Sequence, residues 1–199
     1  MFDEQMRQVK EQVFHPLARP LLRIPPWVFS LLGLVMGLAA AAALWQQAYA
    51  WGLLFWFLNR VLDALDGSVA RLVGEQSDFG GYLDILLDFA TYALIPIGLA
   101  WGRPLPENLL TLTFLLASFY VNAASWMYLA AVLEKQRHIP GHRLTTVTMP
   151  AGIIGGTETI LFYTAFILFP NYLAWLFGLM GLLTALTILQ RVRWAARHI

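Results

Sequence analysis

Long stretches without a charged residue constrain the fold of this chain more than any other feature of its sequence. Three such stretches cover residues 24–59, 108–133 and 159–190. A helix needs ~20 consecutive apolar residues to cross a bilayer, so each stretch holds at least one span, and the first and last could hold parts of two. A composition of 59% hydrophobic and 13% charged residues, with a positive mean hydropathy, is also typical of membrane proteins. We therefore expect an all-α integral membrane protein.

Prolines, glycines and polar links divide the chain into six expected transmembrane helices. They cover residues 27–45, 50–72, 80–102, 108–133, 149–169 and 172–192. No linker or low-complexity segment separates them, so residues 24–199 form one expected membrane domain. The chain has no cysteine, which excludes disulfides and thiolate metal sites.

Residues 1–23 form a separate juxtamembrane segment. Apolar residues follow helical spacing there, at Phe2, Met6, Val9, Val13 and Leu17. The charged residues fall largely elsewhere around such a helix, which favours an amphipathic helix on the membrane surface. The alternative is a solvated tail whose periodicity is accidental.

The distribution of lysine and arginine predicts the orientation. With six helices both termini share one side of the membrane, and eleven basic residues fall on that side: Arg7, Lys10, Arg19, Arg23, Arg71, Lys135, Arg137, Arg143, Arg191, Arg193 and Arg197. Arg103 falls on the other side, and Arg60 lies within a helix. By the positive-inside rule, the termini face the cytoplasm, and we expect a multi-pass protein of the inner (cytoplasmic) membrane.

Four acidic residues stand out within the second and third expected helices: Asp63, Asp66, Asp84 and Asp88. A carboxylate within a membrane helix costs at least ~2.5–3.5 kcal/mol, so each needs a physical reason to be there. The two pairs are spaced i,i+3 and i,i+4, so each pair shares one helix face near the cytoplasmic end. Two such helices joined by a short loop could aim all four carboxylates at one point. Cations relieve the repulsion among close carboxylates most simply, and all-oxygen ligands favour Mg²⁺, Mn²⁺ or Ca²⁺ over zinc or copper.

The spacing around these acids resembles the motif of the CDP-alcohol phosphotransferase (CDP-alcohol phosphatidyltransferase) family. The matching residues are Asp63, Asp66-Gly67, Ala70-Arg71, Gly80, Asp84 and Asp88. The resemblance implies an enzyme that transfers a substituted phosphoryl group from a CDP-linked donor to an alcohol and releases CMP. In most bacterial members the donor is CDP-diacylglycerol. It also implies a homodimer, and we expect no nucleic-acid partner.

The same resemblance implies roles for the acids. Asp63, Asp66 and Asp84 would be metal ligands, and Asp88 would be the general base that takes the acceptor proton. Asp88 would also touch the second ion of a two-metal site holding Mg²⁺ or Mn²⁺. Chemistry is consistent with this division, because an alcohol is a poor nucleophile unless its proton is removed during attack.

Small residues accompany the acids on the second helix. Gly67 and Ala70 lie in register with Asp66, and such a stripe serves either helix packing or, as the resemblance implies, space for the CDP group, which Asp66 would also help to bind. Arg71 could neutralise a donor phosphate or be an ordinary interfacial arginine. Gly80 opens the third helix and could offer free N–H groups to the nucleotide, after a cap at Ser77 or Asp78.

The residues that bind the acceptor are harder to assign. A phosphorylated acceptor would need cations, and Lys135, Arg137 and Arg143 are candidates, although the positive-inside bias alone also predicts basic residues there. Glu158 could recognise the acceptor or form a hydrogen bond between helices. Serine, inositol, inositol phosphate and glycerol phosphate all stay open as acceptors.

Three further features bear on these predictions. Many family members have Pro-Asn before the first helix where this chain has Pro26-Trp27, although Ser30 could replace a nearby threonine hydroxyl. Arg60, one turn before Asp63, is a candidate counter-ion. Intramembrane acids also mark ion paths, so a cation or proton transporter is the alternative function. Against it, the acids are confined to one helical hairpin, and the chain has no second half of related sequence.

Overall fold

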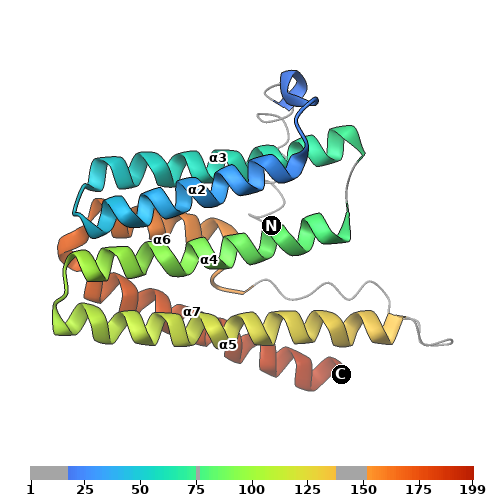
Figure 1. The fold of residues 1–199 in the computed structure, drawn as a ribbon. Helices are drawn as coiled ribbons and strands as arrows, with labels where there is room; N and C mark the ends of the chain where they lie inside the picture. The colour runs from blue at the N-terminus through green and yellow to red at the C-terminus, as the bar shows by residue number, and fades with distance from the viewer. Residues whose placement is uncertain (1–17, 75–76, 138–151) are drawn as a thin grey trace. The chain divides into compact units, whose positions relative to one another are not determined.

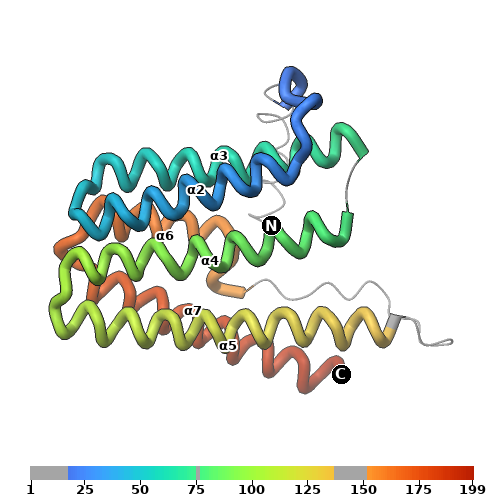
Figure 2. The backbone as a smooth tube through the Cα atoms, viewed as in Figure 1, coloured from blue at the N-terminus to red at the C-terminus, as the bar shows by residue number. Residues whose placement is uncertain are grey.

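The computed structural model describes residues 18–74, 77–137 and 152–199, and these residues form helices and no strands. The chain divides into two compact units. The first consists of residues 1–105 and 163–171, and the second of residues 106–162 and 172–199. Figure 1 labels the helices, and Figure 2 traces the same backbone as a tube.

The first unit is built on three long helices: α2 (Pro26–Trp45), α3 (Tyr49–Val73) and α4 (Asp78–Gly102). A 3₁₀ turn, η1 (Arg19–Leu21), precedes them, and residues 163–168 of α6 (Gly156–Leu168) belong to the same unit, followed by the start of the 3₁₀ turn η2 (Pro170–Tyr172). Helix α2 packs against both α3 and α4.

Glycines bring α2 and α4 together at the end of α4. A Cβ atom added to Gly102 would lie 2.5 Å from the carbonyl oxygen of Leu44, and one added to Gly98 would collide with the carbonyl of Ala41. Only glycine allows backbones to approach this closely, as is common between membrane helices.

Local signals explain where these helices begin and end. Pro26 stands at the first position of α2, where its missing N–H costs nothing. Gly74 ends α3 in the left-handed conformation, with φ of 75°. The side chain of Ser77 caps α4 by accepting a hydrogen bond from the Gly80 N–H at 3.0 Å. Ser77, not Asp78, is therefore the capping residue.

The second unit pairs α5 (Pro106–Arg137) with α7 (Leu173–His198) and includes the first residues of α6. Gly181 lets α7 approach Phe114 and Leu115 of α5. Arg191 is buried and donates hydrogen bonds to the backbone carbonyl and side-chain oxygen of Asn122, at 3.2 and 2.9 Å.

Within the residues that the structure describes, four helical segments are long and apolar enough to cross a membrane: Pro26–Trp45, Asp78–Gly102, Pro106–Gln136 and Pro170–His198. Helix α3 has the length but carries the charged residues of the motif, and α6, with 13 residues, spans only ~20 Å of the ~30 Å hydrocarbon core. The helices support a multi-pass membrane protein, whereas six complete spans stay a prediction. The predicted N-terminal surface helix lies mostly outside the described residues.

Candidate active site

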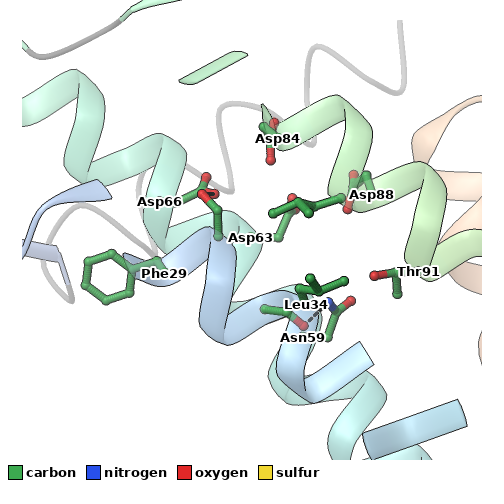
Figure 3. A pocket seen from close by; sticks show the side chains of 11 residues that line it. Phe29, Leu34, Asn59, Asp63, Asp66, Asp84, Asp88 and Thr91 are labelled. Carbon is green, nitrogen blue, oxygen red and sulfur yellow. Dashed lines mark hydrogen bonds between the residues drawn. The ribbon is translucent and has the colours of Figure 1, made fainter. Parts of the chain in front are cut away.

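The four aspartates line one small cavity in the first unit. Asp63 and Asp66 come from α3, and Asp84 and Asp88 come from α4. Figure 3 shows their side chains around a common space. The cavity has a volume of about 10 Å³, close to the minimum that admits one water molecule. The two helices thus bring all four carboxylates to the wall of one cavity, and their convergence on a single point stays a prediction.

Helix α2 completes this cavity and contributes no charge. Ser30 and Gly33 lie on its wall, together with Asn59 of α3 and Thr91 of α4. The Ser30 hydroxyl donates a hydrogen bond to Oδ2 of Asp66 at 2.8 Å, and Asp66 is buried, with 7% of its surface exposed. A charge-assisted hydrogen bond of this kind stabilises a buried carboxylate more than a neutral one would.

Arg60 provides positive charge beside two of the acids. Its Nη2 lies 2.7 Å from Oδ1 of Asp88, and its Nη1 lies 3.8 Å from Oδ2 of Asp63. The predicted role of Arg60 as a counter-ion is thus supported by its position. One guanidinium cannot balance four carboxylates, so the cavity still favours additional cations.

The donor set fits a hard divalent cation by chemistry, because carboxylate oxygens are the ligands that Mg²⁺ and Mn²⁺ prefer. As the side chains stand, however, no three acidic or histidine side chains in the described part of the chain are grouped closely enough to enclose an ion. The fit is therefore one of ligand type and location, and convergence on a single ion would need side-chain rotation.

A second, larger cavity adjoins the first. Its volume is about 500 Å³, and it shares Ser30, Asp66 and Asp84 with the smaller one. All five residues expected to bind the CDP group line it, namely Asp66, Gly67, Ala70, Arg71 and Gly80. A Cβ atom on Gly81 would meet nothing within 4 Å, so the start of α4 is open towards this space.

Some lining residues were missed from the sequence. Trp27 and Phe79 lie on the wall of the larger cavity and are 55% and 69% exposed. They stand at helix starts, where no periodic pattern marks them. Asn59 and Thr91 could have been found, because they lie one helical turn from Asp63 and Asp88.

The predicted acceptor residues that the structure describes lie in the second unit, and their role stays a prediction. Lys135 and Arg137 end α5, and Glu158 stands in the first turn of α6, so all three lie in the second unit. A carboxylate oxygen of Glu158 accepts a hydrogen bond from the Gly155 N–H at 3.0 Å, which stabilises the start of α6. Arg143 lies outside the described residues.

Comparison with known proteins decides the family. The sequence model of the CDP-alcohol phosphatidyltransferase family matches residues 23–190. The chain belongs to this family. The resemblance seen in the aspartate motif is confirmed, and the family and its relatives support a transferase of phospholipid biosynthesis.

Individual relatives agree with this assignment. The chain is similar to inner membrane protein YnjF of Escherichia coli, with 36% identity over 189 residues that cover 89% of this chain and 91% of YnjF. It is also 30% identical over 122 residues to an archaetidylinositol phosphate synthase of Pyrococcus horikoshii, covering 59% of this chain and 64% of the synthase. Together with the apolar helices, these matches identify a multi-pass membrane protein.

A solved structure supports the fold. Phosphatidylinositol phosphate synthase (PgsA1) of Mycobacterium tuberculosis, in complex with manganese and citrate, matches with a TM-score of 0.67 and 22% sequence identity. The match covers 90% of this chain and 87% of that protein. At this identity the likeness establishes a shared fold.

Proposed function

We propose that this protein transfers a phosphatidyl group from CDP-diacylglycerol, or a similar CDP-alcohol, to an alcohol acceptor and releases CMP. The observation that carries the proposal is the junction of the two cavities at Ser30, Asp66 and Asp84. The larger cavity has room for a nucleotide, and the smaller one gathers the carboxylates. The donor pyrophosphate would lie where the two meet.

The residues of the larger cavity suit a CDP group. Three residues on its wall have small side chains or none and therefore leave the space open, namely Gly67, Ala70 and Gly80. Arg71 lines the same wall and is positioned to neutralise a donor phosphate. This assignment rests on the lining of the cavity together with the family motif.

In the smaller cavity, Asp88 acts as the general base. The acceptor O–H bond breaks and its proton passes to a carboxylate oxygen of Asp88. The acceptor oxygen forms a bond to the donor phosphorus, and the bond between that phosphorus and the CMP oxygen breaks. Mg²⁺ or Mn²⁺ in a two-metal site, held by Asp63, Asp66 and Asp84 with Asp88 touching the second ion, would neutralise the pyrophosphate and the charge that develops on CMP.

A phosphorylated polyol is the acceptor class that the relatives support. The synthases of archaetidylinositol phosphate and phosphatidylinositol phosphate resemble this chain at 30% identity, over 64% and 65% of their own lengths. Lys135, Arg137 and Arg143 would supply the cations that such a phosphate needs. We further propose six membrane spans, cytoplasmic termini and active site, and a homodimer.

Metal-dependent CMP release tests the proposal. The purified protein in lipid vesicles would receive CDP-diacylglycerol with Mg²⁺ or Mn²⁺ and, separately, inositol phosphate, glycerol phosphate, inositol or serine. We expect one acceptor to support CMP release. The Asp84→Asn variant, prepared identically, should release no CMP and therefore controls for contaminating activity. Failure with every acceptor and metal would refute the transferase proposal. Ion flux across the same vesicles would instead support the transporter alternative.

A further inference from the structure

Arg60 has no role in the reaction as proposed so far, yet its side chain is among the most heavily bonded in the first unit. Its Nε donates to Oδ1 of Asn59 at 2.9 Å, Nη1 donates to the Tyr92 hydroxyl at 2.9 Å, and Nη2 donates to Oδ1 of Asp88 at 2.7 Å. Asn59 is itself fixed, because its side-chain nitrogen donates to the Gly33 carbonyl of α2 at 2.8 Å.

Aromatic rings enclose the same guanidinium. Its central carbon lies 4.9 Å from the ring centroid of Trp56 and 5.1 Å from that of Tyr92. Such cation–π contacts strengthen when water is excluded, and the Arg60 side chain is only 10% exposed.

Residues of α6 hold these rings in turn. Tyr163 stacks on Trp56 with centroids 5.4 Å apart and meets the edge of Tyr92 at 5.3 Å. The Trp56 indole N–H donates to the Thr164 hydroxyl at 3.2 Å, and the Tyr163 hydroxyl donates to the Tyr92 carbonyl. Arg60 is therefore held by side chains whose own orientations are fixed from α2, α4 and α6.

We infer that Arg60 is the positioning residue for Asp88. Resting on the proposed role of Asp88 as base, the inference is that the rigid guanidinium fixes Oδ1 of Asp88 and thereby sets the direction in which its second oxygen is presented. A carboxylate in the membrane without such a partner could adopt several rotamers, and a misplacement of ~1 Å at a reacting group can cost ~100-fold in rate.

The geometry separates this role from two others. Arg60 is too enclosed to be a general phosphate ligand for the donor, and it does not line the larger cavity, whereas Arg71 does. As a cation beside Asp63 and Asp88, it also opposes a divalent ion rather than recruiting one. Loss of Arg60 should therefore reduce turnover without weakening metal binding, a combination that loss of folding cannot produce.

The test compares Arg60→Gln and Arg60→Lys with Arg103→Gln. Arg103 is a matched control, because it belongs to the same unit and donates to the Asn171 side chain, but it lies at the opposite end of α4 from the aspartates. Each protein would be measured for kcat, for CDP-diacylglycerol affinity, for Mn²⁺ affinity without donor, and for thermal unfolding. Tyr92→Phe, which keeps the ring and removes one acceptor of the guanidinium, serves as a milder second variant.

We expect Arg60→Gln to lower kcat by ~100-fold or more, with donor affinity within ~10-fold and Mn²⁺ affinity equal to or above that of the wild type. Arg60→Lys should recover part of the turnover and Tyr92→Phe should lose a smaller part, while Arg103→Gln should stay within ~2-fold. In an Asp88→Asn background, Arg60→Gln should lower kcat little further, because the two residues act as one coupled unit that the first change has already disrupted.

Two results would overturn the inference while the proposed function stands: an active wild type with Arg60→Gln at full turnover, or Mn²⁺ affinity and turnover falling together in that variant. A wild type that releases no CMP would refute the proposed function itself, and the inference with it.

Discussion

Gly81 offers a direct test of whether the larger cavity holds the donor. It is the fourth residue of α4, and a Cβ atom there would meet nothing within 4 Å. Replacing glycine by alanine or leucine in a helix normally gains up to ~1 kcal/mol in stability. The leucine side chain would project into the cavity and overpack it against a bound nucleotide, at a cost of ~1–3 kcal/mol.

We therefore expect Gly81→Leu to unfold at the same temperature as the wild type or higher, yet to bind CDP-diacylglycerol ~5- to 150-fold more weakly, since ~1.4 kcal/mol is tenfold. Gly81→Ala should fall between them in affinity. Titration calorimetry in lipid nanodiscs measures binding, and thermal unfolding in detergent measures stability.

Gly98→Ala is the matched control and should give the opposite pattern. Its Cβ atom would collide with the Ala41 backbone, which cannot move aside, so unfolding should cost ~1–3 kcal/mol less. Donor affinity of the folded protein should be unchanged, because Gly98 lines neither of the two site cavities. Wild-type donor affinity in Gly81→Leu would show that the nucleotide binds elsewhere.

Three other predictions address the chemistry. Changing Asp63, Asp66 or Asp84 singly to asparagine should abolish CMP release, because neutral amides hold divalent ions poorly. Chelation of the wild type should do the same until Mg²⁺ or Mn²⁺ is restored, and full activity in excess chelator would exclude a metal role. Asp88→Asn should lose turnover but keep CDP-diacylglycerol binding within ~10-fold, as a binding titration would show; a loss of binding as severe as in Asp84→Asn would make Asp88 chiefly a ligand. If a phosphorylated acceptor is used, Arg137→Gln or Arg143→Gln should raise its KM without changing donor affinity, and an unchanged KM would leave these arginines as orientation signals only.

The sequence predicted the helices of the first unit well, because residues close to each end determine where these helices begin and end. Pro25-Pro26 starts α2 and Gly74 ends α3. Helix α4 begins at Asp78, two residues before the Gly80 expected to open it, because the Ser77 cap includes those residues in the first turn. Agreement was poorer where the apolar pattern alone set the limit. Helix α7 continues to His198, beyond residue 192, because hydropathy marks the edge of the apolar segment and not the end of the helix.

Helix α6 shows the opposite error. It was expected over residues 149–169, but the helix begins only at Gly156, and residues 149–151 lie outside the described part of the chain. Just before the helix, the Ile154 N–H donates to the Thr187 hydroxyl of α7. This long-range contact has no local sequence signal.

The candidate site divides in the same way. Charge in an apolar helix is conspicuous, so the four aspartates could be predicted together with their common cavity. Of the wall formed by α2, the sequence singled out only Ser30, as a replacement for a threonine hydroxyl of the family, whereas Gly33 carries no charge and reaches the site only through packing. The aromatic surroundings of Arg60 could not be predicted either. Trp56, Tyr92 and Tyr163 are far apart in the chain, and each is typical of the aromatic residues in a membrane helix.

The contact between α2 and α4 has a consequence for how a lipid-linked donor could enter. The two backbones touch at Gly98 and Gly102, whereas towards Trp27 and Asp84 they border a cavity of about 500 Å³. The two helices are thus in close backbone contact at one end and separated by the cavity at the other, which we call the wide end. Under the proposed function, a donor could slide its headgroup sideways into the wide end while its acyl tails stay in the surrounding lipid. Capture would then be a two-dimensional search, governed by the donor's mole fraction in the membrane and not by its concentration in water.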